Sequence, residues 1–196
     1  MSFYFIRNPG IPFGMINPIL KAALLLSLLN PVTAWPETPP LAQLQARAEA
    51  ASDAGARPLV VFDLDDTLFD SRPRSKQIFL EFAVRPETAE HYPNAVSVLA
   101  SLDPREILYP LAETLASLGL HDPKLREELD AFWKERFFSS AYLRYDRLTP
   151  GARRLTQSLT SLGIRLVYMT GRDRPRMGPG TLAQLSRFGI PGGSLG

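Results

Sequence analysis

An apolar run that ends in a cluster of acids constrains this chain more than any other feature of its sequence. Residues 59–62 read LVVF, and Asp63, Asp65 and Asp66 follow directly. A short, continuous apolar run of this kind predicts a strand buried on both faces in a parallel sheet. Carboxylates at its end are costly to bury and repel one another, so they require a cation, backbone N–H donors or solvent beside them.

A second apolar strand is predicted near the end of the sequence. Residues 165–170 read RLVYMT, and Thr170 and Gly171 stand where the run ends. A helix is predicted before this strand, at 152–162, because Gly163 interrupts the pattern there. Strands that alternate with helices indicate an α/β fold with a parallel sheet, and ligands of such sheets bind beyond the carboxyl ends of the strands. We therefore expect the two strand ends to share one crevice.

The segment between the strands, residues 72–146, is predicted to be helical without any strand. Two of its helices begin at an Asp-Pro pair, at Asp103 and Asp122, which is a helix-start signal. The segment also holds an aromatic group formed by Phe132, Trp133, Phe137 and Phe138. These rings are expected to form the core of the insertion, and the alternative is that they line an apolar pocket for a leaving group.

Shorter helices are predicted at 41–54 and 181–188, and the stretch 171–180, GRDRPRMGPG, is predicted to be a loop. The predicted sheet has two strands only, and its continuation is expected after Gly196. Strand 165–170 is therefore expected to present an exposed edge, which offers a site for self-association or for a partner.

The N-terminal part resembles a signal peptide in its layout. Lys21 precedes the apolar run 22–29, and the small-residue pattern Val32-Thr33-Ala34 follows. The apolar run is too short to span a bilayer, so no stable membrane span is expected. We expect export, to the periplasm or outside the cell, and a cytoplasmic location if this segment is instead a core helix or a surface anchor.

Composition narrows the remaining choices. The chain has 196 residues, of which 45% are hydrophobic, so it suits one globular domain with an insertion. It contains no cysteine, which excludes disulfides and thiolate metal sites. With 22 basic and 20 acidic residues it has no basic stripe, so nucleic acid is not an expected partner.

The acids at the first strand end suit the chemistry of phosphate esters. Two carboxylates in an Asp-x-Asp arrangement, Asp63 and Asp65, offer oxygen ligands to Mg²⁺. One of them can attack phosphorus while the other donates a proton to the leaving group and later activates water. The hydroxyl of Thr170 and the N–H of Gly171 can hold phosphoryl oxygens. A small phosphorylated molecule is therefore the expected substrate.

These motifs carry a resemblance to a known family. VFDLDDTLFDS is similar to the first motif of the haloacid dehalogenase-like phosphohydrolases, and RLVYMTGR resembles their second motif. The resemblance implies a Rossmann-like fold, with Asp63 as nucleophile and Mg²⁺ ligand and Asp65 as general acid/base whose backbone carbonyl also reaches the metal. It implies that Thr170 binds phosphate and that residues 72–146 form a helical cap over the site.

The resemblance also divides the chain. Residues 1–34 are expected to be a signal peptide or N-terminal apolar segment, and 35–57 a linker with a short helix. Residues 58–71 and 147–196 are expected to form an incomplete Rossmann-like core, with the cap at 72–146.

Two further motifs of the family are missing. The family uses a Lys and then an acidic motif after the second motif, whereas the last Lys is Lys134 and no acid follows Asp173. The expectation is a truncated and impaired Mg²⁺-dependent phosphomonoester hydrolase. The alternative is an inactive member of the family that binds a ligand or a protein.

Overall fold

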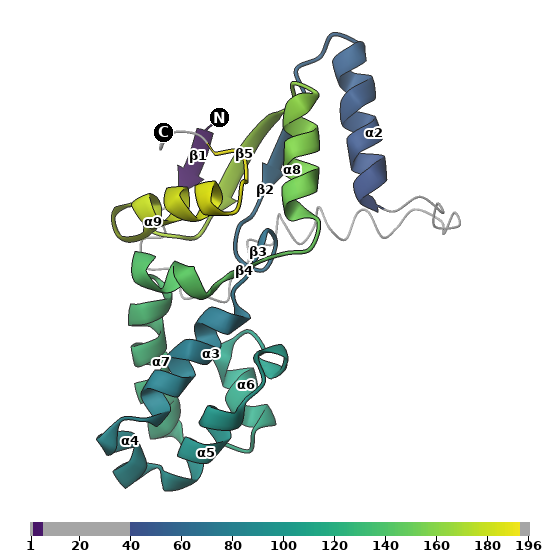
Figure 1. Ribbon diagram of the computed structural model, residues 1–196. Helices are drawn as coiled ribbons and strands as arrows, with labels where there is room; N and C mark the ends of the chain where they lie inside the picture. The colour runs from purple at the N-terminus through teal and green to yellow at the C-terminus, as the bar shows by residue number, and fades with distance from the viewer. Residues whose placement is uncertain (1, 6–39, 193–196) are drawn as a thin grey trace, which may run out of the picture.

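The computed structural model describes residues 2–5 and 40–192, and it consists of a small sheet with helices above a separate helical lobe (Figure 1). Strand β2 spans Leu59–Phe62 and strand β5 spans Arg165–Thr170, as the sequence predicts. They pair in parallel with Leu59 opposite Arg165 and Phe62 opposite Tyr168. Both strands therefore end at the same edge of the sheet, which confirms the α/β class.

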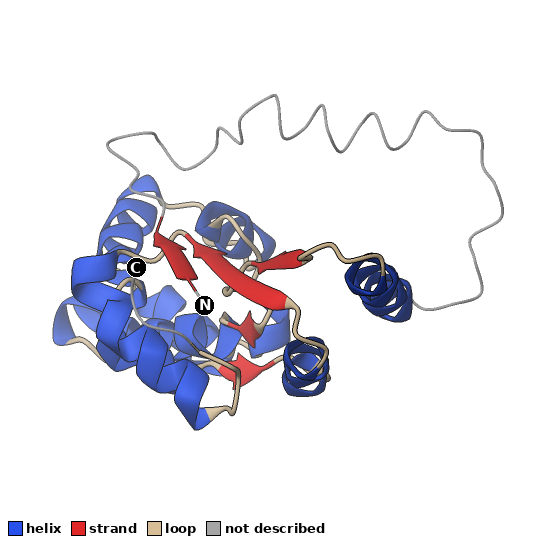
Figure 2. Ribbon diagram, turned by 90° about the horizontal axis from the view of Figure 1, so that it is seen from above, coloured by secondary structure: helices blue, strands red, loops and turns tan. Residues whose placement is uncertain are grey.

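The expectation that β5 is an exposed edge is wrong. Strand β1, Ser2–Phe5, pairs in parallel with the other side of β5, so the strand order is β1-β5-β2 and β5 is central (Figure 2). The pairing satisfies backbone N–H and C=O groups that an edge strand leaves open. Among the described strands, β1 and β2 are the two edges of this sheet, and self-association through a sheet edge stays a prediction.

Helices cover one face of this sheet. They are α8 (Ala152–Ser161) and α9 (Arg174–Arg187), and α2 (Pro40–Asp53) packs beside α8 (Figure 1). Buried side chains from the strands, such as Leu166 and Tyr168, pack with Leu159 and Leu185 of the helices. On the opposite face Leu59 and Val61 are 44% and 49% exposed, so the prediction that β2 is buried on both faces is wrong for the described residues.

The insertion is helical, as predicted, and forms the lower lobe in Figure 1. Its elements are α3 (Arg72–Ala83), α4 (Pro86–His91), α5 (Pro93–Ser101), η1 (Pro104–Glu106), α6 (Leu111–Ser117), α7 (Pro123–Phe137) and η2 (Ser140–Tyr145). The side chain of Asp122 caps α7 through the N–H groups of Lys124 and Leu125, and Asp103 caps η1. Trp133 and Phe137 are buried in the core of this cap lobe, which confirms that part of the prediction.

Two short strands join the cap to the sheet domain. Strand β3, Phe69–Asp70, pairs antiparallel with β4, Arg147–Leu148, so the chain entering the cap and the chain leaving it lie side by side. The sequence analysis did not predict this pair. Strands of two residues are too short to show an alternating apolar pattern.

The segment 171–180 is also not the loop that was predicted, because α9 begins at Arg174. The carboxylate of Asp173 accepts a hydrogen bond from the backbone N–H of Arg176 at 3.0 Å, which caps the helix, and Pro175 occupies the first turn. The sequence pattern does not predict this helix, because Gly178, Pro179 and Gly180 have low helix propensity. Gly180 serves packing instead, since a Cβ there would lie 2.5 Å from Oγ of Ser140.

No helix in residues 40–192 is long and apolar enough to cross a membrane. Of the predicted signal peptide or N-terminal apolar segment, 1–34, the structure describes residues 2–5, which form β1; the rest of that segment and residues 35–39 of the predicted linker lie outside the described residues.

Candidate active site

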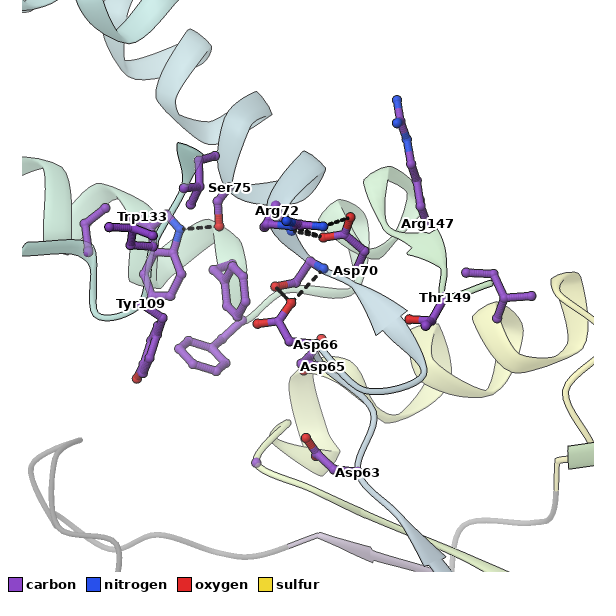
Figure 3. A pocket seen from close by; sticks show the side chains of 18 of the residues that line it. Asp63, Asp65, Asp66, Asp70, Arg72, Ser75, Tyr109, Trp133, Arg147 and Thr149 are labelled. Carbon is purple, nitrogen blue, oxygen red and sulfur yellow. Dashed lines mark hydrogen bonds and ion pairs between the residues drawn. The ribbon is translucent and has the colours of Figure 1, made fainter. Parts of the chain in front are cut away.

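A cavity of about 980 Å³ lies between the carboxyl ends of the strands and the cap lobe (Figure 3). Asp63 and Asp65 reach it from the end of β2, and Gly171 reaches it from the end of β5. The expected shared crevice is therefore present. Its remaining walls come from the start of α3, the segment after η1, the end of α7 and the residues around β4.

Asp63 is an exposed acid of this cavity. Its side chain accepts a hydrogen bond from Oγ1 of Thr67 at 3.5 Å, and among the described residues it forms no ion pair. Partial burial raises the pKa of Asp63, and the negative charge of Asp65 adds to the effect. A carboxylate that is raised in pKa and free of cations remains available to attack an electrophile or to bind a cation.

Asp65 is held by arginines. Nε and Nη2 of Arg172 donate to its two carboxylate oxygens at 2.9 and 2.8 Å, and Nη2 of Arg74 donates to Oδ1 at 2.5 Å. Burial alone would raise the pKa of Asp65, but the charges of Arg172 and Arg74 outweigh it and lower the pKa to about 2. Asp65 is therefore ionised in this arrangement.

The same arginines bind a second buried acid. Nε and Nη2 of Arg74 donate to Asp146 at 2.7 and 2.6 Å, and Nη2 of Arg172 donates to it at 3.3 Å. Burial raises the pKa of Asp146 in spite of these donors. Because a guanidinium stays charged in proteins and three donor groups converge on this acid, we take it to be ionised as well.

Gln184 completes this buried ionic cluster, which consists of Asp65, Arg74, Asp146, Arg172 and Gln184. Its Nε2 donates to Asp146 at 2.7 Å, and its Oε1 accepts from Nη1 of Arg172 at 2.7 Å. The cluster joins the loop after β2, the first turn of α3, the end of the cap and α9. Sequence analysis missed it, and the nearest signal was that Arg74 and Asp146 stand at the two predicted ends of the cap.

The side chain of Asp66 stabilises a turn before α3. The backbone φ of Asp66 is +58°, in the left-handed region, and its Oδ1 accepts from the N–H and the hydroxyl of Ser71 at 3.0 and 2.7 Å. The side chain thereby fixes the turn that leads into α3.

Thr170 and Gly171 differ in access to the cavity. Thr170 is 2% exposed, and its hydroxyl oxygen accepts the backbone N–H of Arg172 at 3.2 Å. Gly171 is exposed and lines the cavity. The geometry therefore presents the backbone at Gly171 to a ligand, and it directs the Thr170 hydroxyl to the turn.

The oxygen donors present suit a magnesium ion in part. The carboxylate of Asp63 is open, and the main-chain carbonyl of Asp65 accepts none of the backbone hydrogen bonds of the described loop. The Asp65 carboxylate is occupied by arginines, so its carbonyl is the better ligand. No group of three acidic or histidine side chains within the described residues is arranged to hold a metal.

Comparison with known proteins agrees with this geometry. No curated protein and no solved structure matches the chain. The family model described as haloacid dehalogenase-like hydrolase matches residues 58–190, which include both strand ends and the whole cap. Since this match covers well over half of the sequence, the chain belongs to the family of haloacid dehalogenase-like hydrolases.

Proposed function

We propose that this chain is a Mg²⁺-dependent phosphomonoester hydrolase that acts through an aspartyl-phosphate on Asp63. One observation carries the proposal. The Asp63 carboxylate is exposed in the cavity without an ion pair among the described residues, and Gly171, directly after the neighbouring strand β5, lines the same space. A nucleophile and a backbone site for phosphoryl oxygens therefore lie together at one edge of the sheet.

The reaction divides into two displacements. An oxygen of Asp63 forms a bond to phosphorus while the ester P–O bond breaks, and the leaving oxygen takes up a proton. Water then attacks the phosphorus of the aspartyl-phosphate, which releases inorganic phosphate and restores the Asp63 carboxylate. In the second step the ionised Asp65 accepts a proton from the attacking water. The proton that the leaving oxygen takes up in the first step comes from solvent water, because ionised Asp65 carries none.

The Asp63 carboxylate and the Asp65 carbonyl would hold the magnesium ion. When bound, Mg²⁺ would offset the negative charge that accumulates between carboxylate and phosphoryl oxygens. Asp63 then needs no cationic side chain of its own in the ground state. The raised pKa of this acid is consistent with a site that lacks a compensating charge.

A second candidate function is ligand binding without turnover. The observation that favours it is the occupation of both Asp65 oxygens by guanidinium groups, which leaves no proton for a leaving group. The 196-residue chain would then bind a phosphorylated ligand and release it unchanged. The same cavity serves both candidates, so only turnover distinguishes them.

The test uses the full chain, its Asp63→Asn variant and an Asp130→Asn control, which alters a partly exposed acid of α7 paired with Lys134, outside the cavity. Binding of beryllium fluoride with Mg²⁺ is followed by ¹⁹F NMR, and phosphate release from an aryl phosphate is assayed with and without Mg²⁺. Binding and Mg²⁺-dependent release that Asp63→Asn alone abolishes support the hydrolase. Binding without release supports the second candidate, and unchanged behaviour of Asp63→Asn contradicts both.

A further inference from the structure

The cavity has two chemically distinct halves. The half formed by the sheet domain carries the acids Asp63 and Asp65 with Gly171, and it is the phosphoryl side of the proposed function. The half formed by the cap is apolar. It is lined by Ile107, Leu108, Tyr109, Leu111, Trp133, Phe137 and Phe138, which we call the aromatic wall. Figure 3 shows Trp133 and Tyr109 on one side of Asp65 and Asp66.

The aromatic wall is preformed. Nε1 of Trp133 donates to Oγ of Ser75 at 3.0 Å, which fixes the indole. The rings of Trp133 and Phe137 stack with centroids 4.2 Å apart, and the Phe138 ring meets that of Phe137 edge-on at 5.2 Å. Rings that already hold one another lose little side-chain entropy when a ligand binds.

Part of the wall is exposed where a ligand would cover it. Leu108 and Tyr109 are 46% and 58% exposed, although both are large and border the cavity. An apolar ligand group would remove this surface from water, which is favourable in proportion to the area buried. The volume of about 980 Å³ accommodates a phosphoryl group together with a group of one or two rings.

The charges around the cavity argue against a second anionic group on the ligand. Arg72 is engaged by Asp70 through two hydrogen bonds at 2.7 and 2.9 Å. Arg147 is the remaining exposed cation that borders the cavity, and Figure 3 places it on the side opposite Trp133 and Tyr109. A nucleotide or sugar bisphosphate would therefore meet no free cation beside the aromatic wall in the described residues.

From this arrangement we infer that the cap binds the leaving group of an aromatic phosphomonoester, an uncharged planar ring system seated against Trp133, Phe138, Leu108 and Tyr109. The inference rests on the proposed function, because it takes the phosphoryl group to lie at Asp63. It identifies the wall as the part of the protein that selects the substrate.

The test measures binding by calorimetry with two non-hydrolysable ligands, naphthylmethylphosphonate and methylphosphonate, in the presence of Mg²⁺. Naphthylmethanol serves as a third ligand without the phosphoryl group. The full chain is compared with Leu108→Ala and Tyr109→Ala, which change exposed residues, and with Phe138→Ala. The control is Val84→Ala, because Val84 is 75% exposed on the cap and does not line the cavity.

We expect naphthylmethylphosphonate to bind about tenfold or more tightly than methylphosphonate. Each wall substitution is expected to narrow this ratio without changing the affinity for methylphosphonate, and Val84→Ala is expected to preserve it. Equal affinity for the two phosphonates would overturn the aromatic leaving group and leave the proposed function standing. Failure of both phosphonates to bind, or naphthylmethanol binding as tightly as its phosphonate, would overturn the phosphoryl site itself.

Discussion

The guanidinium of Arg172 binds the carboxylate of Asp65 through two parallel hydrogen bonds, although 107 positions separate them in the chain. Bidentate pairs of this kind are specific in geometry as well as strong. Because Arg74 at the start of the cap binds the same carboxylate, Asp65 links the loop of the proposed nucleophile to the cap. If the cap rotated about the segments that join it to the sheet domain, the hydrogen bond between Arg74 and Asp65 would have to break, or Asp65 would have to move with the cap.

Replacement of Arg172 by Met is expected to destabilise the protein strongly. The Arg172 side chain is fully buried. Its loss removes hydrogen-bond donors from the carboxylates of Asp65 and Asp146, and buried carboxylates cannot replace those donors fully with water. We expect a loss of about 3–5 kcal/mol in the free energy of unfolding, measured by urea denaturation. Arg165→Met, at an exposed position of β5, is the matched control. A loss for Arg172→Met no larger than that of the control would contradict an energetic role of the cluster.

Acid is expected to weaken the protein through Asp65. Its pKa is lowered from 3.8 to about 2, so the stabilisation is complete above the unfolded value and disappears as the pH falls through about 2. The difference corresponds to about 2 kcal/mol. Between about pH 5 and about pH 2, the free energy of unfolding should fall by this amount more in the wild type than in Asp65→Asn. Parallel curves for the two proteins would show that Asp65 is not held ionised.

Asp66→Ala is expected to destabilise the entry to the cap. The substitution removes the acceptor for the N–H and the hydroxyl of Ser71. It also places an alanine, which has no polar side chain to stabilise the left-handed region, at φ +58°. We expect a loss of roughly 1–3 kcal/mol, from the capping bonds and the left-handed backbone together. Asp66→Asn keeps an acceptor and tolerates this backbone, so its thermal midpoint should stay near that of the wild type. Equal effects of Ala and Asn would contradict the role of the Asp66 side chain as acceptor for Ser71.

Gly180→Ala is expected to destabilise α9 against η2, even though Ala favours helices over Gly. The added Cβ would lie 2.5 Å from Oγ and 2.6 Å from Cβ of Ser140. Overpacking of this kind costs about 1–3 kcal/mol, which is measurable by thermal unfolding. The double variant with Ser140→Gly removes both atoms and should recover most of the loss. Stabilisation by Gly180→Ala alone would show that the two elements separate easily.

Local patterns in the sequence were enough to place strands β2 and β5 and the nucleophile candidate. The bounds of β2 and β5 follow from short apolar runs that end at acidic residues or at Gly171. Their parallel arrangement follows from the helices between them. The sequence also predicts the start of α7 at Asp122, because a capping hydrogen bond involves only neighbouring residues. The family likewise follows from two motifs, each contained in a few consecutive residues.

Contacts between distant residues were decided only by the tertiary structure. The partners of Arg74, Asp146 and Arg172 lie up to 107 positions away, and no spacing rule connects them. Strand β1 reaches β5 by the same kind of long-range pairing, through backbone hydrogen bonds between segments far apart in the chain. The sequence by itself thus determined the fold class and the acids at the strand end. Which of these acids is open and which is neutralised was decided by side chains that folding brings together, because charge and burial act through space and not along the chain.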